Sequence, residues 1–143
     1  MKAEFWTTFG RYMSPVPSAD GKKINWVNFH TGVKDVYFRM DAGNKSASIS
    51  ISLEHQDVDI QEIYFSQFME LNSLLHETLG EPWKWELHVQ HDGKIVSRIS
   101  KTLQGVSVLN KEHWGDLISF FKLRIVALDR FWENAKYSFE TLR

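Results

Sequence analysis

The chain has 143 residues, no cysteine, 17 basic against 18 acidic side chains, and 20 aromatic residues (10 Phe, 6 Trp and 4 Tyr). This length predicts one domain, spanning residues 1–143, with a hydrophobic core of its own. The lack of cysteine excludes disulfides, thiolate catalysis and thiolate zinc sites. The net charge of −1 excludes a basic field over the whole surface. Because no long apolar run and no signal peptide is visible, we expect a cytoplasmic protein that does not use a membrane.

The first third of the chain predicts a helix, a loop and a less certain segment. Phe5, Phe9, Tyr12 and Met13 fall on one face of a helix over residues 4–13. Residues 14–23 contain two prolines and a glycine, which is typical of an exposed loop. Residues 24–29 fit either a short strand or an aromatic loop.

Residues 36–41 and 46–54 predict the clearest pair of strands, with the turn 42–45 joining them as a hairpin. In the second strand apolar residues alternate with serines, so one face is apolar and the other is small and polar. The alternating residues are Ala47, Ile49, Ile51 and Leu53 against Ser48, Ser50 and Ser52.

A helix is predicted to follow, over residues 60–79. Asp59 and Glu62 have the spacing of a capping box, apolar residues then recur every three or four positions, and Gly80 ends the pattern.

A second hairpin and a long helix complete the chain. The turn Asp92–Gly93 separates strands over residues 83–91 and 95–103. Helical spacing then runs from Asn110 almost to Arg143, with a bend near Lys122 or a projecting end expected because the helix exceeds the body of so small a domain. These elements predict an α+β fold in two or three layers: a mainly antiparallel sheet of four to five strands, built from two hairpins and packed with three helices.

Six histidines raise the question of a metal site. His88 and His91 stand three apart at the end of a predicted strand, where side chains point to opposite faces, and His55, His76 and His113 are scattered elsewhere. Since zinc needs three or four converging ligands, we predict no metal site here and no cofactor.

One order of residues resembles that of restriction-endonuclease-like folds, which place an Asp on one strand of a hairpin and a Glu near the end of the next. Asp41 ends the first predicted strand, and Glu54 and Gln56 end the second. Two converging carboxylates there hold Mg²⁺, which activates water for attack on a phosphate. These residues are candidate catalysts only under this hypothesis, and Mg²⁺ is expected only with it. The common use of acidic residues in turns is the competing explanation.

A candidate binding surface combines basic and aromatic side chains, the pattern that contacts phosphates and stacks bases. Arg39 is placed where a strand should be half-buried, which indicates an ion pair with Asp35, Asp41 or Glu54, or a bound anion. The other members of this candidate surface are Lys94, Arg98, Lys101, Trp83 and Trp85.

The end of the last helix offers a candidate interaction surface. Phe131, Trp132 and Tyr137 spread over more than one helical face, so some of them could lie exposed and pair with a second copy of the chain.

Motifs along the whole chain resemble an uncharacterised bacterial domain-of-unknown-function family. They are Phe5-Trp6-x-x-Phe9-Gly10, Ile24-Asn25-Trp26 with Thr31-Gly32, Tyr37 to Asp41, the helix from Gln61 to Leu75, Trp83-x-Trp85-Glu86, and Phe131-Trp132. Such domains occur alone or C-terminal to restriction-endonuclease-like nuclease domains. The resemblance implies an association with DNA-processing or defence systems, and it implies no catalytic residue.

Three functional hypotheses follow, and whether the protein is an enzyme stays open among them. The first is a nucleic-acid-associated accessory module. The second is a protein-interaction or homo-oligomerisation module that uses the C-terminal helix, and the third is a divergent Mg²⁺-dependent nuclease.

Overall fold

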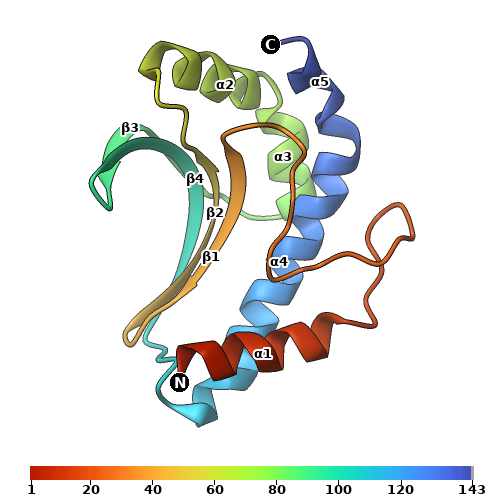
Figure 1. Ribbon diagram of the computed structural model, residues 1–143, viewed down its shortest axis with the longest axis vertical. Coiled ribbons are helices and arrows are strands. Elements are labelled where there is room, and N and C mark those ends of the chain that lie inside the picture. The colour runs from red at the N-terminus through yellow and green to blue at the C-terminus, as the bar shows by residue number, and fades with distance from the viewer. Residues whose placement is uncertain (143) are drawn as a thin grey trace.

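The computed structural model describes residues 1–142 and has an α+β architecture, with a four-stranded antiparallel sheet packed against helices (Figure 1). The strands are β1 (Val36–Ala42), β2 (Ser46–Leu53), β3 (Lys84–His91) and β4 (Lys94–Gln104). Their order across the sheet is β1-β2-β4-β3, so the two hairpins join through the pairing of β2 with β4. The predicted antiparallel sheet of two hairpins is confirmed.

The helices lie on one side of this curved sheet, and the other side is left open (Figure 1). They are α1 (Lys2–Met13), α2 (Val58–Glu70), α3 (Asn72–Leu79), the 3₁₀ turn η1 (Lys111–His113), α4 (Trp114–Ala135) and α5 (Tyr137–Glu140). Because side chains alternate along a strand, Ile49, Ile51 and Ile99 turn toward the helices and are fully buried. Over residues 1–142, none of the helices combines the length and apolar character needed to cross a bilayer.

Aromatic rings fill much of the space between the sheet and α4. Phe68 of α2 stacks on Phe131 and Trp132 of α4, with ring centroids 6.3 and 6.1 Å apart. A second group joins α1 to α4 through Phe5, Phe9 and Phe121. Such rings each bury about 150–250 Å², so the aromatic excess of the sequence is mainly a core.

Residues 24–29 form a loop and no strand. Trp26 is buried, and its indole Nε1–H donates to the carbonyl oxygen of Val16 at 2.9 Å. The whole stretch between α1 and β1 is therefore a connection that an aromatic side chain fixes to the core, which agrees with the second of the two sequence-based alternatives.

The helix predicted over 60–79 is two helices, because Leu71 leaves the helical conformation at φ −98° and ψ 13°. The bend predicted near Lys122 is wrong, because α4 runs past Lys122 without interruption; the helix is interrupted at Lys136, between α4 and α5. Beyond this interruption Phe139 is buried, with its ring centroid 4.4 Å from that of Phe68. The predicted end near Arg143 lies outside the described residues.

The start of α2 also differs from the prediction. Asp57 is the N-cap, and its carboxylate accepts hydrogen bonds from the backbone N–H groups of Asp59 at 2.9 Å and Ile60 at 3.4 Å. Asp59, which the spacing had assigned as the cap, lies inside the first turn.

Candidate functional site

The open face of the sheet is the candidate site, and its floor consists of small hydroxyl side chains. The register places Ser50 beside Ser100 and Ser48 beside Thr102, on the same face as Arg39 of β1 and Arg98 of β4. A hollow of about 580 Å³ lies over this floor, between β1, β2 and the tip of the β3–β4 hairpin. The alternation of serines with isoleucines in β2 is what leaves this face open and polar.

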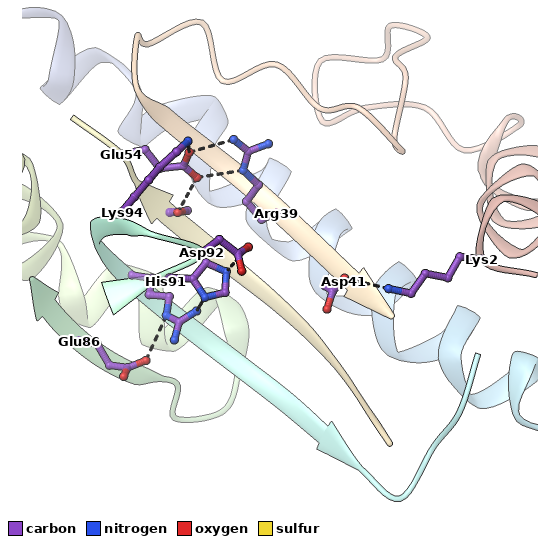
Figure 2. Close-up of polar contacts among 10 residues, drawn as sticks. Lys2, Arg39, Asp41, Glu54, Glu86, His91, Asp92 and Lys94 are labelled. Atoms are coloured by element: carbon purple, nitrogen blue, oxygen red, sulfur yellow. Dashed lines mark hydrogen bonds and ion pairs between the residues drawn. The ribbon is translucent and has the colours of Figure 1, made fainter. Parts of the chain in front are cut away.

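Glu54 lies at one end of the hollow and binds two basic side chains (Figure 2). Arg39 donates from Nε to Oε2 and from Nη2 to Oε1, both at 3.0 Å, and the Ser52 hydroxyl donates to Oε2 at 2.8 Å. The Lys94 ammonium lies 3.9 Å from Oε1. Burial opposes ionisation of Glu54, but these hydrogen bonds and the two positive charges outweigh it and hold the pKa of the carboxyl below 4.5.

In the group of Glu54, Arg39 and Lys94, the acidic side chain is more deeply buried than the two basic ones. The Glu54 side chain is 13% exposed, whereas those of Arg39 and Lys94 are 54% and 68% exposed. The carboxylate therefore lies beneath the basic groups and orients them toward solvent. The hydrogen bonds to Glu54 also raise the pKa of Arg39, which keeps it charged.

Glu86 repeats this arrangement at the other edge of the sheet. Its carboxylate lies 3.3 Å from Arg98 Nε and 3.7 Å from Lys84 Nζ, and its side chain is 18% exposed against 74% for Lys84. Arg98 Nη1 also lies 3.1 Å from Nδ1 of His91, whose Nε2 is 3.5 Å from Asp92 (Figure 2). Each of the two partly buried carboxylates thus holds two basic side chains.

A β-bulge brings the hairpin tip to this face. Leu87 and His88 together lie opposite Ser97, and His88 has a φ of 51°. The Ser97 hydroxyl accepts from the His88 N–H at 3.0 Å and donates to the side-chain oxygen of Gln61 on α2, and both Ser97 and Gln61 are fully buried. Bulges bend a hairpin, and this one turns the tip away from the helices, so that Lys94 reaches Glu54.

The structure separates the candidate catalysts Asp41 and Glu54. Asp41 lies opposite Ser48 and Glu54 lies six residues further along β2, on the order of 20 Å away at about 3.3 Å per residue. Asp41 pairs with Lys2 at 3.9 Å, Glu54 pairs with Arg39, and Gln56 is exposed in the following loop. The structure therefore does not support a Mg²⁺ site shared by Asp41 and Glu54, because the antiparallel register places the two residues at opposite ends of the strands. Within residues 1–142, no group of three His, Asp or Glu side chains is arranged to hold a metal ion.

The candidate binding residues divide between the two faces of the sheet. Arg39, Lys94 and Arg98 come together around the hollow. Lys101 pairs in register with the buried Ile49, so it lies on the helix side.

Neither tryptophan of the candidate set lies on the open face. Trp83 is buried, with its indole N–H donating to Glu81 at 2.9 Å. Trp85 packs edge-on against Phe65 of α2. Trp83 and Trp85 are therefore not placed to stack on bases at the open face of the sheet.

The candidate interaction surface is mostly internal. Phe131 and Trp132 are 2% and 3% exposed, because α4 carries its aromatic residues against the sheet and α2. The Trp132 indole N–H donates to the carbonyl oxygen of Thr31 at 2.7 Å. Only Tyr137, which is 57% exposed, can meet a partner without rearrangement of the core.

Comparison with known protein families gives a match over almost the whole chain. The sequence model of a domain of unknown function (DUF4268) matches residues 1–136. Searches of curated proteins and of solved structures returned no match.

Proposed function

Since the chain belongs to the DUF4268 family, whose function is unknown, we propose a function from its own geometry: it is a nucleic-acid-binding accessory module, and the phosphate backbone crosses the open face of the sheet. The observation that carries this proposal is the paired arrangement at Glu54 and Glu86. Each carboxylate is largely covered and contacts two basic side chains; Arg39, Lys94 and Lys84 are more than half exposed, whereas Arg98 is 26% exposed.

Carboxylates in this position favour phosphate binding because they fix the geometry of the donors above them. A guanidinium oriented by a carboxylate loses less conformational freedom when it binds a ligand than a free side chain does. Each group of two bases and one acid carries a net charge of +1. Asp41 and Asp92 also line the hollow, where Asp41 pairs with Lys2 and Asp92 lies beside His91. The hydroxyls of Ser48, Ser50 and Ser100 add neutral donors of the kind that contact phosphate and sugar oxygens.

The spacing of the basic residues suits an extended anion. Arg39 on β1 and Lys84 on β3 are aligned through Ser50 and Ser100, three strand spacings apart, or about 14 Å. Basic groups therefore flank a hydroxyl-lined floor on both sides, and a backbone that crosses the strands meets both groups. Because contacts to phosphate and sugar carry no information on the bases, we expect little dependence on base sequence.

The wider role is part of the same proposal. The motifs resemble those of a bacterial family found alone or beside restriction-endonuclease-like domains, which supports a cytoplasmic module that assists DNA processing or defence. The separation of Asp41 and Glu54 supports this binding role over the nuclease alternative, since that mechanism needs the two carboxylates to converge.

Fluorescence anisotropy with labelled single-stranded and duplex oligonucleotides of mixed sequence tests the proposal. At low salt we expect saturable binding, weakened about 5- to 30-fold by Arg39→Gln or Arg98→Gln, since each removes about 1–2 kcal/mol of charge-assisted contact. Arg39→Lys keeps the charge and loses the two-pronged geometry, so its effect should be smaller.

Arg11→Gln is the matched control, because Arg11 is exposed on α1 and makes no side-chain ion pair among the described residues. Its affinity should equal that of the parent protein. Circular dichroism must show that every variant is folded. Absence of binding by the parent protein at 20 mM salt, or equal losses in Arg11→Gln and Arg39→Gln, would refute the proposal.

A further inference from the structure

A second pocket, far from the open sheet face in sequence and in the fold, lies between the loop that follows α1 and the C-terminal half of α4. Its volume is about 320 Å³, and its lining includes Asn25, Asn28, Phe29, Asp129 and Trp132. The loop is fixed to α4 by two contacts, from the Ala19 N–H to Asp129 and from the Trp132 indole to the Thr31 carbonyl. Pockets of this size take a compact organic group.

Asp129 is the unusual residue of this pocket. It is only 6% exposed, and among the described residues no Lys or Arg side chain forms an ion pair with it. Its Oδ2 accepts from the Ala19 N–H at 2.7 Å, while Oδ1 accepts no hydrogen bond from the described residues. Oδ1 is also not fully enclosed by protein, since over residues 1–142 the fully enclosed side-chain nitrogen and oxygen atoms without a hydrogen-bond partner are the two ring nitrogens of His55. A buried carboxylate is normally paired, so Asp129 faces the pocket with an unmet need for a positive partner.

The surroundings of Asp129 increase this need. Burial raises the pKa of Asp129, and the negative charges of Glu133 and Asp20 raise it further. Asp20 itself stays ionised, because hydrogen bonds from the Ser18 hydroxyl and the Lys22 backbone N–H lower its pKa. Lys136, which lines the pocket, lies 3.7 Å from Glu133, and Lys22, which does not line it, lies 4.0 Å from Asp20. The lining itself carries three carboxylates and one ammonium and is therefore negative.

The other residues that line the pocket indicate which kind of cation it binds. No three carboxylate or imidazole groups within residues 1–142 converge as metal ligands, so a bare metal ion does not fit. Phe29 and Trp132 instead give the pocket apolar walls, against which the carbon chain of an organic cation can pack. From these contacts we propose that the pocket binds a compact organic cation, a guanidinium or primary ammonium group whose N–H donors reach Asp129 Oδ1 while its carbon chain lies against the two rings.

Nuclear magnetic resonance titration tests this proposal, with the Trp132 indole N–H as the reporter. We expect n-butylguanidinium to shift this resonance saturably at millimolar concentrations, and the neutral isostere n-butylurea to leave it unchanged. Asp129→Asn keeps the acceptor for Ala19 and removes the charge, so it should fold and bind at least 10-fold more weakly. The matched control Asp116→Asn removes an exposed carboxylate from the same helix and should bind as the parent protein does.

A second titration distinguishes the two sources of such a cation. A short arginine-containing peptide that binds more than 10-fold more tightly than n-butylguanidinium supports a side chain of a partner protein, and equal affinities support a free small molecule. No saturable shift in the parent protein with either probe would overturn the proposal, as would equal binding by Asp129→Asn. Because this pocket shares no residue with the open sheet face, failure here leaves the nucleic-acid proposal untouched.

Discussion

His55 is a buried side chain with an unfavourable environment. It is 7% exposed, neither ring nitrogen has a hydrogen-bond partner in the structure, and its ring lies 4.3 Å from that of Tyr64. Burial lowers the pKa of His55 below 6.5, and the nearby charge of Asp35 opposes this only in part. The folded chain therefore holds His55 neutral under conditions in which the unfolded chain begins to protonate it.

The sign of the resulting pH dependence follows from proton uptake. As the pH falls, the unfolded state binds a proton at His55 more readily than the folded state does, so the free energy of unfolding should fall as the pH drops from 7.5 to 5.5. We expect His55→Phe to reduce this loss and, by removing two unsatisfied polar atoms, to raise stability at pH 7.5 by about 1 kcal/mol.

Urea unfolding at the two pH values checks this expectation, with His76→Gln as the control because His76 is exposed on α3. If His55→Phe and the parent protein lose equal stability over this range, His55 is not the titrating group.

Single elements show what local sequence determines and where it misleads. The alternation in β2, the Asp92–Gly93 turn and the helical spacing of residues 114–135 are local patterns, and each predicted its element correctly. The cap of α2 did not follow the pattern: Asp59 has the capping-box spacing to Glu62, but Asp57, two residues earlier, is the N-cap. The geometry of the chain entering from β2 selects Asp57, which adopts the extended φ of −79° and ψ of 112° of an N-cap.

Paired substitutions measure that choice. Asp57→Ala removes an acceptor for two backbone N–H groups and should reduce the free energy of unfolding by about 1 kcal/mol. Asp59→Ala, within the first turn, should cost only a few tenths of a kcal/mol through the helix dipole. Chemical denaturation of both variants gives the comparison, and a larger loss in Asp59→Ala would restore the capping box.

The bulge in β3 had no signal in the sequence. This bulge depends on a long-range contact: Ser97 accepts a hydrogen bond from the His88 N–H and donates one to Gln61 of α2, and neither Ser97 nor Gln61 looks unusual in a linear pattern. The ion pair of Arg39 with Glu54 was one of three predicted alternatives, but the second group of charges around Glu86 was missed for the same reason. Arg39, Lys94 and Arg98 could be proposed from residue type, but only the register and the bulge show that they share one hollow.

At the scale of the whole molecule, the aromatic residues contribute mainly to the stability of the core and less to a surface that could bind a partner. Trp132 contacts Phe38, Phe68 and Phe139 and donates a hydrogen bond to the loop before β1. Trp132→Ala should therefore cost about 3–5 kcal/mol in unfolding free energy.

Tyr137→Ala, at an exposed position, should change stability by less than about 0.5 kcal/mol. Thermal and urea unfolding test both substitutions, and near-parental stability of Trp132→Ala would contradict its assignment to the core.

Sedimentation of Tyr137→Ala beside the parent protein shows whether the C-terminal helix also mediates self-association. A concentration-dependent dimer weakened by this change would support that role.

The central claim is that basic side chains oriented by Glu54 and Glu86 bind a phosphate backbone, and the salt dependence of oligonucleotide binding tests it most directly. The slope of log Kobs against log salt should be negative for the parent protein. It should become shallower by about 0.7 to 0.9 for each phosphate that the Arg39→Gln/Arg98→Gln double variant no longer neutralises. An unchanged slope in that variant, or affinity that does not respond to salt, would contradict the account.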